Sequence, residues 1–330
     1  MSSVPSADEI ARDATWCAQA LDPAAGVARL VAMDREAYRA ASFLDDRMLQ
    51  QAVDSRLVAW AEIEAAMAGA GRTDARWIFH IGHVGSTLVS RLLGELPAVL
   101  AVREPRLLRD LALSPAEVRG RYLAPVPALM SRTFGDAETA CVKATSFASD
   151  IAPELVPPGE RALFLTASPE NYIASILAGE NSVKELHMLE ASRAARSAER
   201  IALPAPSSDA GRAAAAWACE MTALEAAADV MGDRHILWAD FDAMLGGMGL
   251  ALTEVAEFFG FSTDGVDEIA RGPLMQRYSK SLKYDYSPDL RRELIAVAAR
   301  THAADIADAL AMLRAGAEKS PLLARALARA

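Results

Sequence analysis

Residues 82–87, Gly-His-Val-Gly-Ser-Thr, place two glycines beside two adjacent hydroxyl side chains. A short apolar run at 76–81 precedes them, and the apolar residues that follow recur with helical spacing as far as Pro97. The pattern predicts a buried strand, a loop and a helix. Free N–H groups at the start of a helix bind anions, and glycines let an anion approach the backbone closely. The loop is therefore predicted to bind an anion, and a tight turn without a ligand is the alternative.

A nucleoside triphosphate loop of the GxxxxGK[ST] type does not fit these residues. With Gly85 as the second glycine of that pattern, the lysine position holds Ser86 and the first glycine position holds His80. A polyphosphate bound with Mg²⁺ would lack its usual cation, which disfavours a metal-dependent kinase. The loop instead favours a cradle for a single phosphate.

Two residues with reactive side chains lie at the ends of other apolar runs. Glu104 follows one run and precedes Pro105, and Lys143 ends another. A glutamate in this position is a candidate general base, with pairing to Arg103 or Arg106 as the alternative. A lysine that ends a buried strand needs a partner, which favours a functional role for Lys143.

The two histidines near the loop support different interpretations. His80 ends the first apolar run and is interpreted as a core histidine. His83 lies in the loop, as either a ligand contact or an exposed polar residue. The pair has no third metal ligand nearby in the sequence, so no metal site is predicted.

The elements that position these residues follow from the pattern of the rest of the chain. Short apolar runs alternate with helical patterns at 76–81, 98–102, 139–143, 161–166 and 235–239. Such alternation predicts an α/β fold in three layers, with a P-loop-like parallel sheet of about five strands flanked by helices. In sheets of this kind ligands bind at the carboxyl ends of the strands. The loop, Glu104 and Lys143 are therefore expected at one edge of the sheet.

The chain before this alternation is rich in alanine and helical in pattern. We expect residues 1–74 to form an N-terminal helical extension and residues 75–330 to form the α/β domain. Charged residues of the C-terminal helices, Arg291 among them, are interpreted as a solvated face.

Composition limits the classes of function. The chain has 330 residues, a net charge of −10 and 52% hydrophobic residues, which is ordinary for a globular protein. The acidic balance argues against nucleic acid or anionic membrane as a partner. Three scattered cysteines form no disulfide or thiolate-metal pattern, and no segment resembles an export signal or a membrane span. A cytoplasmic protein is expected.

Four segments resemble the sulfotransferases of the P-loop type, which use 3′-phosphoadenosine 5′-phosphosulfate as donor. They are FHIGHVGSTLVSRLL at 79–93, SPENYIAS at 168–175, LWADFDAML at 237–245 and LTEVAEFFGF at 252–261. The first two are similar to the two donor-binding motifs of that family. The last two are similar to a strand, an acidic turn and a helix near the end of many members. The resemblance covers residues 75–286 and implies the same α/β fold.

This chain departs from the family pattern at positions that contact the donor. His83 and Val84 stand where the family has a lysine or arginine followed by a serine, and Ala167 stands where it has an arginine. Ser175 keeps its place six residues after Pro169. A basic segment at 271–286 could compensate, since it holds two of only five lysines in the chain.

The resemblance implies roles for individual residues. The predicted donor-binding residues are Gly82, His83, Val84, Gly85, Ser86, Thr87, Ser175, Arg277, Lys280 and Lys283. Sulfuryl transfer needs a cation near the leaving oxygen, a base for the acceptor and a charge on the sulfuryl oxygens. We assign these roles to His83, Glu104 and Lys143 in that order, and we expect no metal.

The prediction for function is transfer of a sulfuryl group from phosphoadenosine phosphosulfate to a hydroxyl or amine of a small molecule or peptide. The substituted donor positions also favour an alternative, a noncatalytic nucleotide-binding module. A P-loop kinase is the least favoured alternative. The acceptor and the oligomeric state stay open.

Overall fold

Five parallel strands form the central sheet of the protein, in the order β5-β6-β4-β7-β8. Their bounds are β4 Arg76–His80, β5 Val99–Arg103, β6 Thr139–Lys143, β7 Arg161–Thr166 and β8 His235–Asp240. These positions come from a computed structural model, which describes residues 4–50, 53–231, 235–276 and 288–330. Each strand coincides with one of the predicted apolar runs, so the predicted parallel α/β fold is confirmed.

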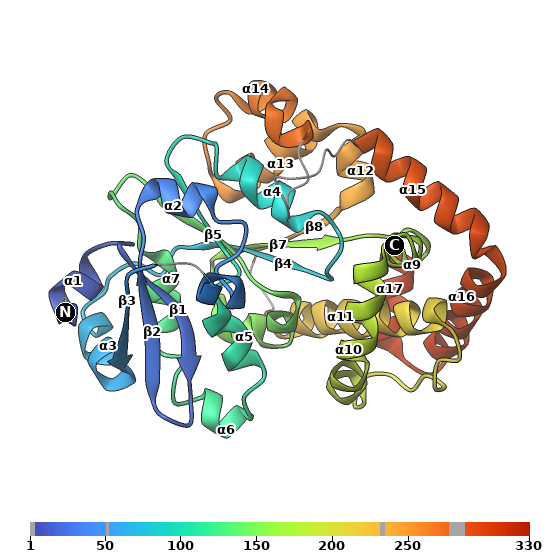
Figure 1. The fold of residues 1–330 in the computed structure, drawn as a ribbon, viewed down its shortest axis with the longest axis horizontal. Coiled ribbons are helices and arrows are strands. Elements are labelled where there is room, and N and C mark those ends of the chain that lie inside the picture. Colours follow the sequence, from blue (N-terminus) through green and yellow to red (C-terminus); the bar gives the residue numbers. More distant parts are fainter. Residues whose placement is uncertain (1–3, 51–52, 232–234, 277–287) are drawn as a thin grey trace.

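Helices cover both faces of this sheet (Figure 1). Helices α4 and α13 pack on one face, and α7, α11 and the 3₁₀-helix η2 pack on the other. Because both faces are covered, residues such as Trp77 on β4 and Phe164 on β7 are fully buried, which explains why the strands are apolar without alternation.

The helices that precede or follow the strands have the following bounds. In the first half of the chain they are α1 Ala7–Arg12, α2 Arg35–Ala40, α3 Trp60–Met67, α4 Ser86–Leu93, α5 Arg106–Ala112, α6 Ala116–Arg119, α7 Val126–Ser131 and α8 Ala152–Leu155. In the second half they are α9 Pro169–Leu177, α10 Glu180–Ser197, α11 Asp209–Met231, α12 Phe241–Gly246, α13 Met248–Phe259, α14 Val266–Arg271, α15 Pro288–Thr301, α16 Ala303–Ala317 and α17 Pro321–Arg329. The 3₁₀-helices are η1 Asp46–Gln50, η2 Ser146–Ile151 and η3 Pro273–Gln276.

The expectation of an all-helical N-terminal extension is wrong. Residues 1–74 hold a three-stranded antiparallel sheet with the strands β1 Trp16–Asp22, β2 Val27–Ala32 and β3 Ser55–Ala59. The alanines in β1 and β2 have high helix propensity, but they alternate with larger side chains. Burial of one face of the sheet, as at Leu30 and Val58, overrides that propensity.

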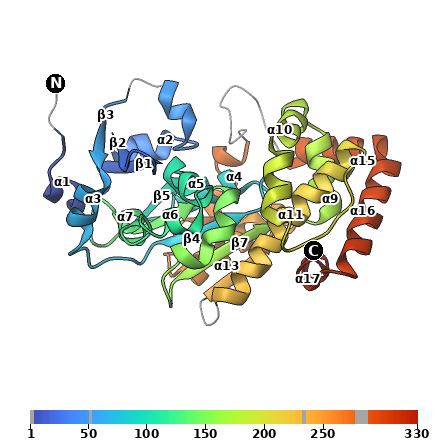
Figure 2. The same cartoon turned by 90° about the horizontal axis from the view of Figure 1, so that it is seen from below.

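The two ends of the described chain lie far apart. Figure 2 shows α1 beside the N-terminal sheet and α17 at the opposite end of the molecule. Between them, one hydrophobic cluster of the described residues extends from Ile10 through β4 to Ala326. Among the described helices, none is both long and apolar enough to cross a membrane.

Candidate anion-binding and catalytic site

The loop after β4 turns sharply into helix α4. Gly82, His83 and Gly85 all have positive φ angles, of 80°, 53° and 62°. Helix α4 then begins at Ser86, so the N–H groups of Ser86 and Thr87 have no carbonyl one turn earlier to bind. These two N–H groups form the positive end of the helix, as the sequence predicts.

Gly85 has a packing role that the sequence does not reveal. A Cβ atom on Gly85 would lie 1.9 Å from Cζ of Phe241, the first residue of α12. The ring of Phe241 is buried and occupies the space that any other residue would fill. Glycine at this position is therefore required for packing, whether or not an anion binds nearby.

Lys143 lies at the centre of the carboxyl edge of the sheet. Strand β6 runs between β5 and β4, so its last residue lies beside both the loop after β4 and the residue that follows β5. The ammonium of Lys143 is fully buried, donates a hydrogen bond to Oγ1 of Thr87 at 3.2 Å, and forms an ion pair with Glu104. The structure thus joins Lys143, Glu104 and the start of α4.

Glu104 is held in position by its backbone and its side chain. Its N–H donates to the carbonyl of Lys143 at 2.7 Å, and its φ of 51° turns the chain out of β5. Burial opposes ionisation of the carboxyl group, but the charge of Lys143 and the nearby ring of His80 outweigh burial and hold the pKa of Glu104 well below its usual range. Glu104 is therefore a carboxylate at neutral pH.

His80 belongs to the same group of side chains, which the sequence interpretation missed. Its Nδ1 accepts a hydrogen bond from the N–H of Gly82 at 3.0 Å, so the proton of the neutral ring lies on Nε2. Nε2 faces Oε1 of Glu104 at 3.6 Å. Burial lowers the pKa of His80, which keeps the ring neutral. The only signal in the sequence was the position of His80 at the carboxyl end of a strand.

His83 lies against a different part of the molecule. Its Nε2 is 3.8 Å from Oε1 of Glu185 on α10, and its ring meets Tyr172 of α9 edge-on, with the ring centroids 6.3 Å apart. The structure therefore places His83 on the side of α9 and α10, while Glu104 and Lys143 lie on the side of β5.

In the segment 168–175, the side chains of Ser168 and Ser175 bond within helix α9. Helix α9 begins at Ser168, whose side chain caps the N–H of Asn171. The hydroxyl of Ser175 donates to the carbonyl of Tyr172 at 2.8 Å, as a satisfied helix serine does. The predicted cations Arg277, Lys280 and Lys283 lie outside the described residues.

One described arginine approaches this region from an element that the sequence interpretation placed in solvent. Arg291 of α15 forms an ion pair with Asp242 and lies 5.2 Å from the centroid of the Phe241 ring. Its side chain is 12% exposed, so the interpretation of a solvated face is wrong for this residue. Arg291 thus brings a positive charge next to the ring that packs on Gly85.

The arrangement defines a class of site. An N-terminal helix end, a buried ammonium and a partly buried carboxylate meet at the carboxyl edge of a parallel sheet, which suits an anionic substrate beside a group that takes up a proton. Among the described residues, no three His, Cys, Asp or Glu side chains cluster as metal ligands do.

Two solved structures are similar to this chain. A sulfotransferase domain from the curacin biosynthetic pathway has a TM-score of 0.43 and 10% sequence identity, covering 68% of this chain and 89% of that chain. A sulfotransferase from Alicyclobacillus acidocaldarius has a TM-score of 0.38 and 15% identity, covering 72% of this chain and 94% of that chain. No protein-family model and no curated protein matches. Likeness at this level transfers no residue roles, so function has to be inferred from the site.

Proposed function

We propose that the protein transfers a sulfuryl group from 3′-phosphoadenosine 5′-phosphosulfate to a hydroxyl or amine of a small molecule or peptide. The observation that carries the proposal is the contact of the buried Lys143 with both Thr87 at the start of α4 and Glu104. This contact connects the predicted anion cradle to a carboxylate. Sulfuryl transfer needs both, because a negatively charged group moves while the acceptor loses a proton.

The residues present fit a phosphosulfate at the start of α4. The N–H groups of Ser86 and Thr87 would donate to the leaving phosphate, and the ammonium of Lys143 would neutralise charge on the transferring group. The donor supplies the sulfuryl group, whose bond to the bridging oxygen breaks as a bond to the acceptor oxygen or nitrogen forms.

Glu104 would take the proton of the acceptor. While it is paired with Lys143 its low pKa makes it a weak base. A bound anion at Thr87 competes for the ammonium of Lys143, and weakening of the ion pair raises the pKa of Glu104. We infer that donor binding in this way activates the base. The proton then resides on Glu104, with Nε2 of His80 beside it.

His83 enters the proposal as the cation on the leaving side of the donor. Glu185, 3.8 Å from its Nε2, favours the protonated ring. Arg291 is a further candidate for the anionic part of the nucleotide, since Ala167 leaves the position of the family's arginine without a charge.

The substitutions at His83, Val84 and Ala167 favour one other candidate, a noncatalytic nucleotide-binding module. Calorimetry with adenosine 3′,5′-bisphosphate, the desulfated donor, tests both candidates. Binding without Mg²⁺ is expected for either, and absence of binding contradicts both. A preference for ATP with Mg²⁺ would instead indicate a kinase.

The Glu104→Gln variant separates the enzyme from the noncatalytic module. We expect its rate of sulfuryl transfer, or of donor hydrolysis where no acceptor is at hand, to fall by roughly 10²–10⁴-fold with little change in bisphosphate affinity. His83→Ala is expected to lower the rate at every pH, whereas His83→Lys keeps activity at high pH, where an ammonium stays charged and an imidazolium does not. Bisphosphate binding without transfer or hydrolysis by the parent protein would favour the noncatalytic module.

A further inference from the structure

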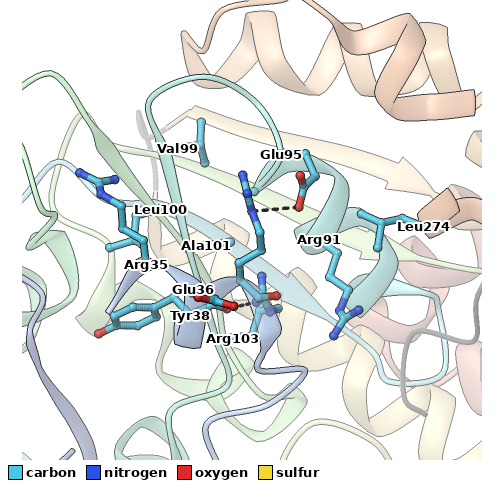
Figure 3. A pocket seen from close by; sticks show the side chains of 12 residues that line it. Arg35, Glu36, Tyr38, Arg91, Glu95, Val99, Leu100, Ala101, Arg103 and Leu274 are labelled. Carbon is cyan, nitrogen blue, oxygen red and sulfur yellow. Dashed lines mark hydrogen bonds and ion pairs between the residues drawn. The ribbon is translucent and has the colours of Figure 1, made fainter. Parts of the chain in front are cut away.

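A cavity lies along the outer edge of the sheet, away from the start of α4. It has a volume of about 630 Å³ and is enclosed by α2, α4, the edge strand β5 and η3 (Figure 3). We name it the α2–α4 cavity. Its volume lies within the range of small-molecule sites in proteins.

The lining of the α2–α4 cavity is rich in arginine. It contains four arginines and two glutamates, a formal excess of two positive charges. Two of the arginines at the rim are already paired, because Arg35 contacts Glu138 and Arg39 contacts Glu95. Arg91 and Arg103 remain, with Glu36 as the one further carboxylate of the lining, so the lining together with Glu138 keeps one net positive charge.

Arg91 and Arg103 are buried without a carboxylate partner. They are 8% and 2% exposed, and within the described ranges neither guanidinium forms an ion pair. In Figure 3 they extend from α4 and β5 toward α2. Buried charges are ordinarily paired, since removing a charge from water is costly. Two adjacent arginines without a counter-ion therefore need an explanation.

The C-terminal carbonyls of α2 satisfy only part of this need. Arg103 donates to the carbonyls of Tyr38, of Ala41 at 2.7 Å and of Arg39 at 3.1 Å, and Arg91 donates to the carbonyl of Ala40 and the hydroxyl of Ser42. These acceptors carry partial charges at the negative end of a short helix. Nε of Arg91 is buried and has no hydrogen-bond partner among the described residues.

Electrostatics and shape agree with this picture. Burial, together with the nearby charge of Arg91, lowers the pKa of Arg103 to about 10. Leu100, Val99, Ala101 and Leu274 also line the cavity and supply apolar surface. The lining thus combines a cationic end with an apolar surface.

We propose that the α2–α4 cavity binds a small organic oxyanion, whose carboxylate, phosphate or sulfate group is held by Arg91 and Arg103 and whose apolar body lies against Leu100 and Leu274. Guanidinium groups recognise oxyanions of this kind through paired N–H donors. The site is separate from the donor site at Thr87 and does not depend on sulfuryl transfer.

Titration calorimetry with phenyl phosphate, benzoate and phenol tests the proposal. Both anions are expected to bind the parent protein and neutral phenol is not, and the stronger of the two anions identifies the headgroup. Saturating adenosine 3′,5′-bisphosphate is expected to leave phenyl phosphate binding unchanged. Displacement by the bisphosphate would place the anion in the donor site and overturn the proposal, as would equal binding of phenol or no binding of either anion.

Three variants locate the binding. Arg91→Met keeps the apolar stem and removes the charge, and we expect anion affinity to fall roughly tenfold to hundredfold. Val99→Phe fills the cavity and keeps both arginines, so it remains informative where loss of Arg91 disturbs α2. Arg325→Met, on α17 at the far end of the molecule, removes an arginine outside the cavity. Unchanged affinity in both cavity variants, or an equal loss in Arg325→Met, contradicts the site.

Discussion

Three titratable side chains determine what the carboxyl edge of the sheet can do. Lys143, Glu104 and His80 come from three neighbouring strands or their ends; Lys143 and His80 are buried and Glu104 is partly buried. Lys143 stabilises the carboxylate of Glu104, and that carboxylate in turn favours a proton on His80. The low pKa of Glu104 is a consequence of the contact with Lys143, whereas burial outweighs the carboxylate at His80 and keeps its ring neutral.

The protonation state of His80 can be tested through stability. Burial places its folded pKa below the unfolded value of 6.5, so the unfolded chain takes up a proton first as pH falls. The contribution of neutral His80 to stability is therefore complete above pH 6.5 and is lost as pH falls toward the folded pKa. The His80→Asn variant, whose side-chain oxygen can still accept from Gly82, lacks this dependence. We expect the difference in unfolding temperature between parent and variant to shrink as pH falls from about 8 to about 5.

A difference that stays constant over this range would contradict a lowered pKa for His80. Thermal unfolding of both proteins in the same series of buffers provides the measurement. Other groups that titrate in both proteins cancel in the difference.

The sequence predicts where these residues lie in the sheet, but it does not predict which side chains they contact. Lys143 and Glu104 were predicted at the sheet edge because each ends an apolar run. The alternative that Glu104 pairs with Arg103 or Arg106 is wrong, since Arg103 bonds to carbonyls at the end of α2 and Arg106 contacts Asp46 and Asp110. Such partners come from segments distant in the sequence, and strand order, which a single sequence does not specify, brings them together.

At the scale of elements, the contact between α4 and α12 restricts the loop that precedes α4. The ring of Phe241 fills the space beside Gly85, and the guanidinium of Arg291 lies 5.2 Å from the centroid of that ring. Loss of nucleotide binding in a Gly85 variant would therefore have two explanations, a blocked anion cradle or a displaced α12. Stability measurements can separate them.

Gly85→Ala is expected to destabilise the protein by about 2–4 kcal/mol, from a positive φ and the overlap with the ring of Phe241. Replacing the ring by a leucine side chain in Gly85→Ala/Phe241→Leu should relieve this overlap. The loss of unfolding free energy in the double variant is therefore expected to be smaller than the sum of the two single losses by about 1 kcal/mol or more. The measurement is a double-mutant cycle by urea unfolding.

Gly82→Ala is the matched control for this cycle. Gly82 also has a positive φ, of 80°, but an added Cβ meets nothing within 4 Å. We expect Gly82→Ala to lower the free energy of unfolding by about 1–2 kcal/mol from backbone strain alone, with no coupling to Phe241→Leu. Additive effects in the Gly85 cycle would mean that the ring does not determine the need for glycine.

The elements themselves were predictable where the pattern was unambiguous. The five parallel strands are short apolar runs, and α13 ends at Gly260, which adopts the left-handed conformation. In the N-terminal sheet the same kind of reasoning failed, because alanine favours helices while its burial in β1 and β2 depends on tertiary packing. These segments form strands because residues distant in the sequence bury their side chains, and a local sequence pattern carries no information about such contacts.

At the scale of the whole molecule, the N-terminal sheet is attached to the α/β part by buried polar contacts as well as by the shared hydrophobic cluster. The hydroxyl of Tyr38 donates to the carbonyl of Ala14 inside the N-terminal part. Arg132, directly after α7, donates to the carbonyls of Ile10 at 2.5 Å and Trp16 at 2.8 Å. One guanidinium thus joins α7 to both α1 and β1, across the predicted boundary at residue 75.

We expect the two parts to unfold together, and Arg132→Met tests this. The methionine keeps the apolar stem but leaves the carbonyls of Ile10, Trp16 and Leu129 without this donor, which should lower stability by about 2–4 kcal/mol. Because the parts share one core, far-ultraviolet circular dichroism and tryptophan fluorescence are expected to report one coincident thermal transition in parent and variant, shifted to lower temperature in the variant. Arg47→Met, which removes an exposed pair with Asp45 in the same N-terminal part, is the control and should change stability by less than about 1 kcal/mol. The contrary result is a variant in which the N-terminal part unfolds in an early transition and the rest unfolds at the parental temperature. That result would show that the sheet of β1 to β3 is an independent unit, which leaves the candidate site intact when it unfolds.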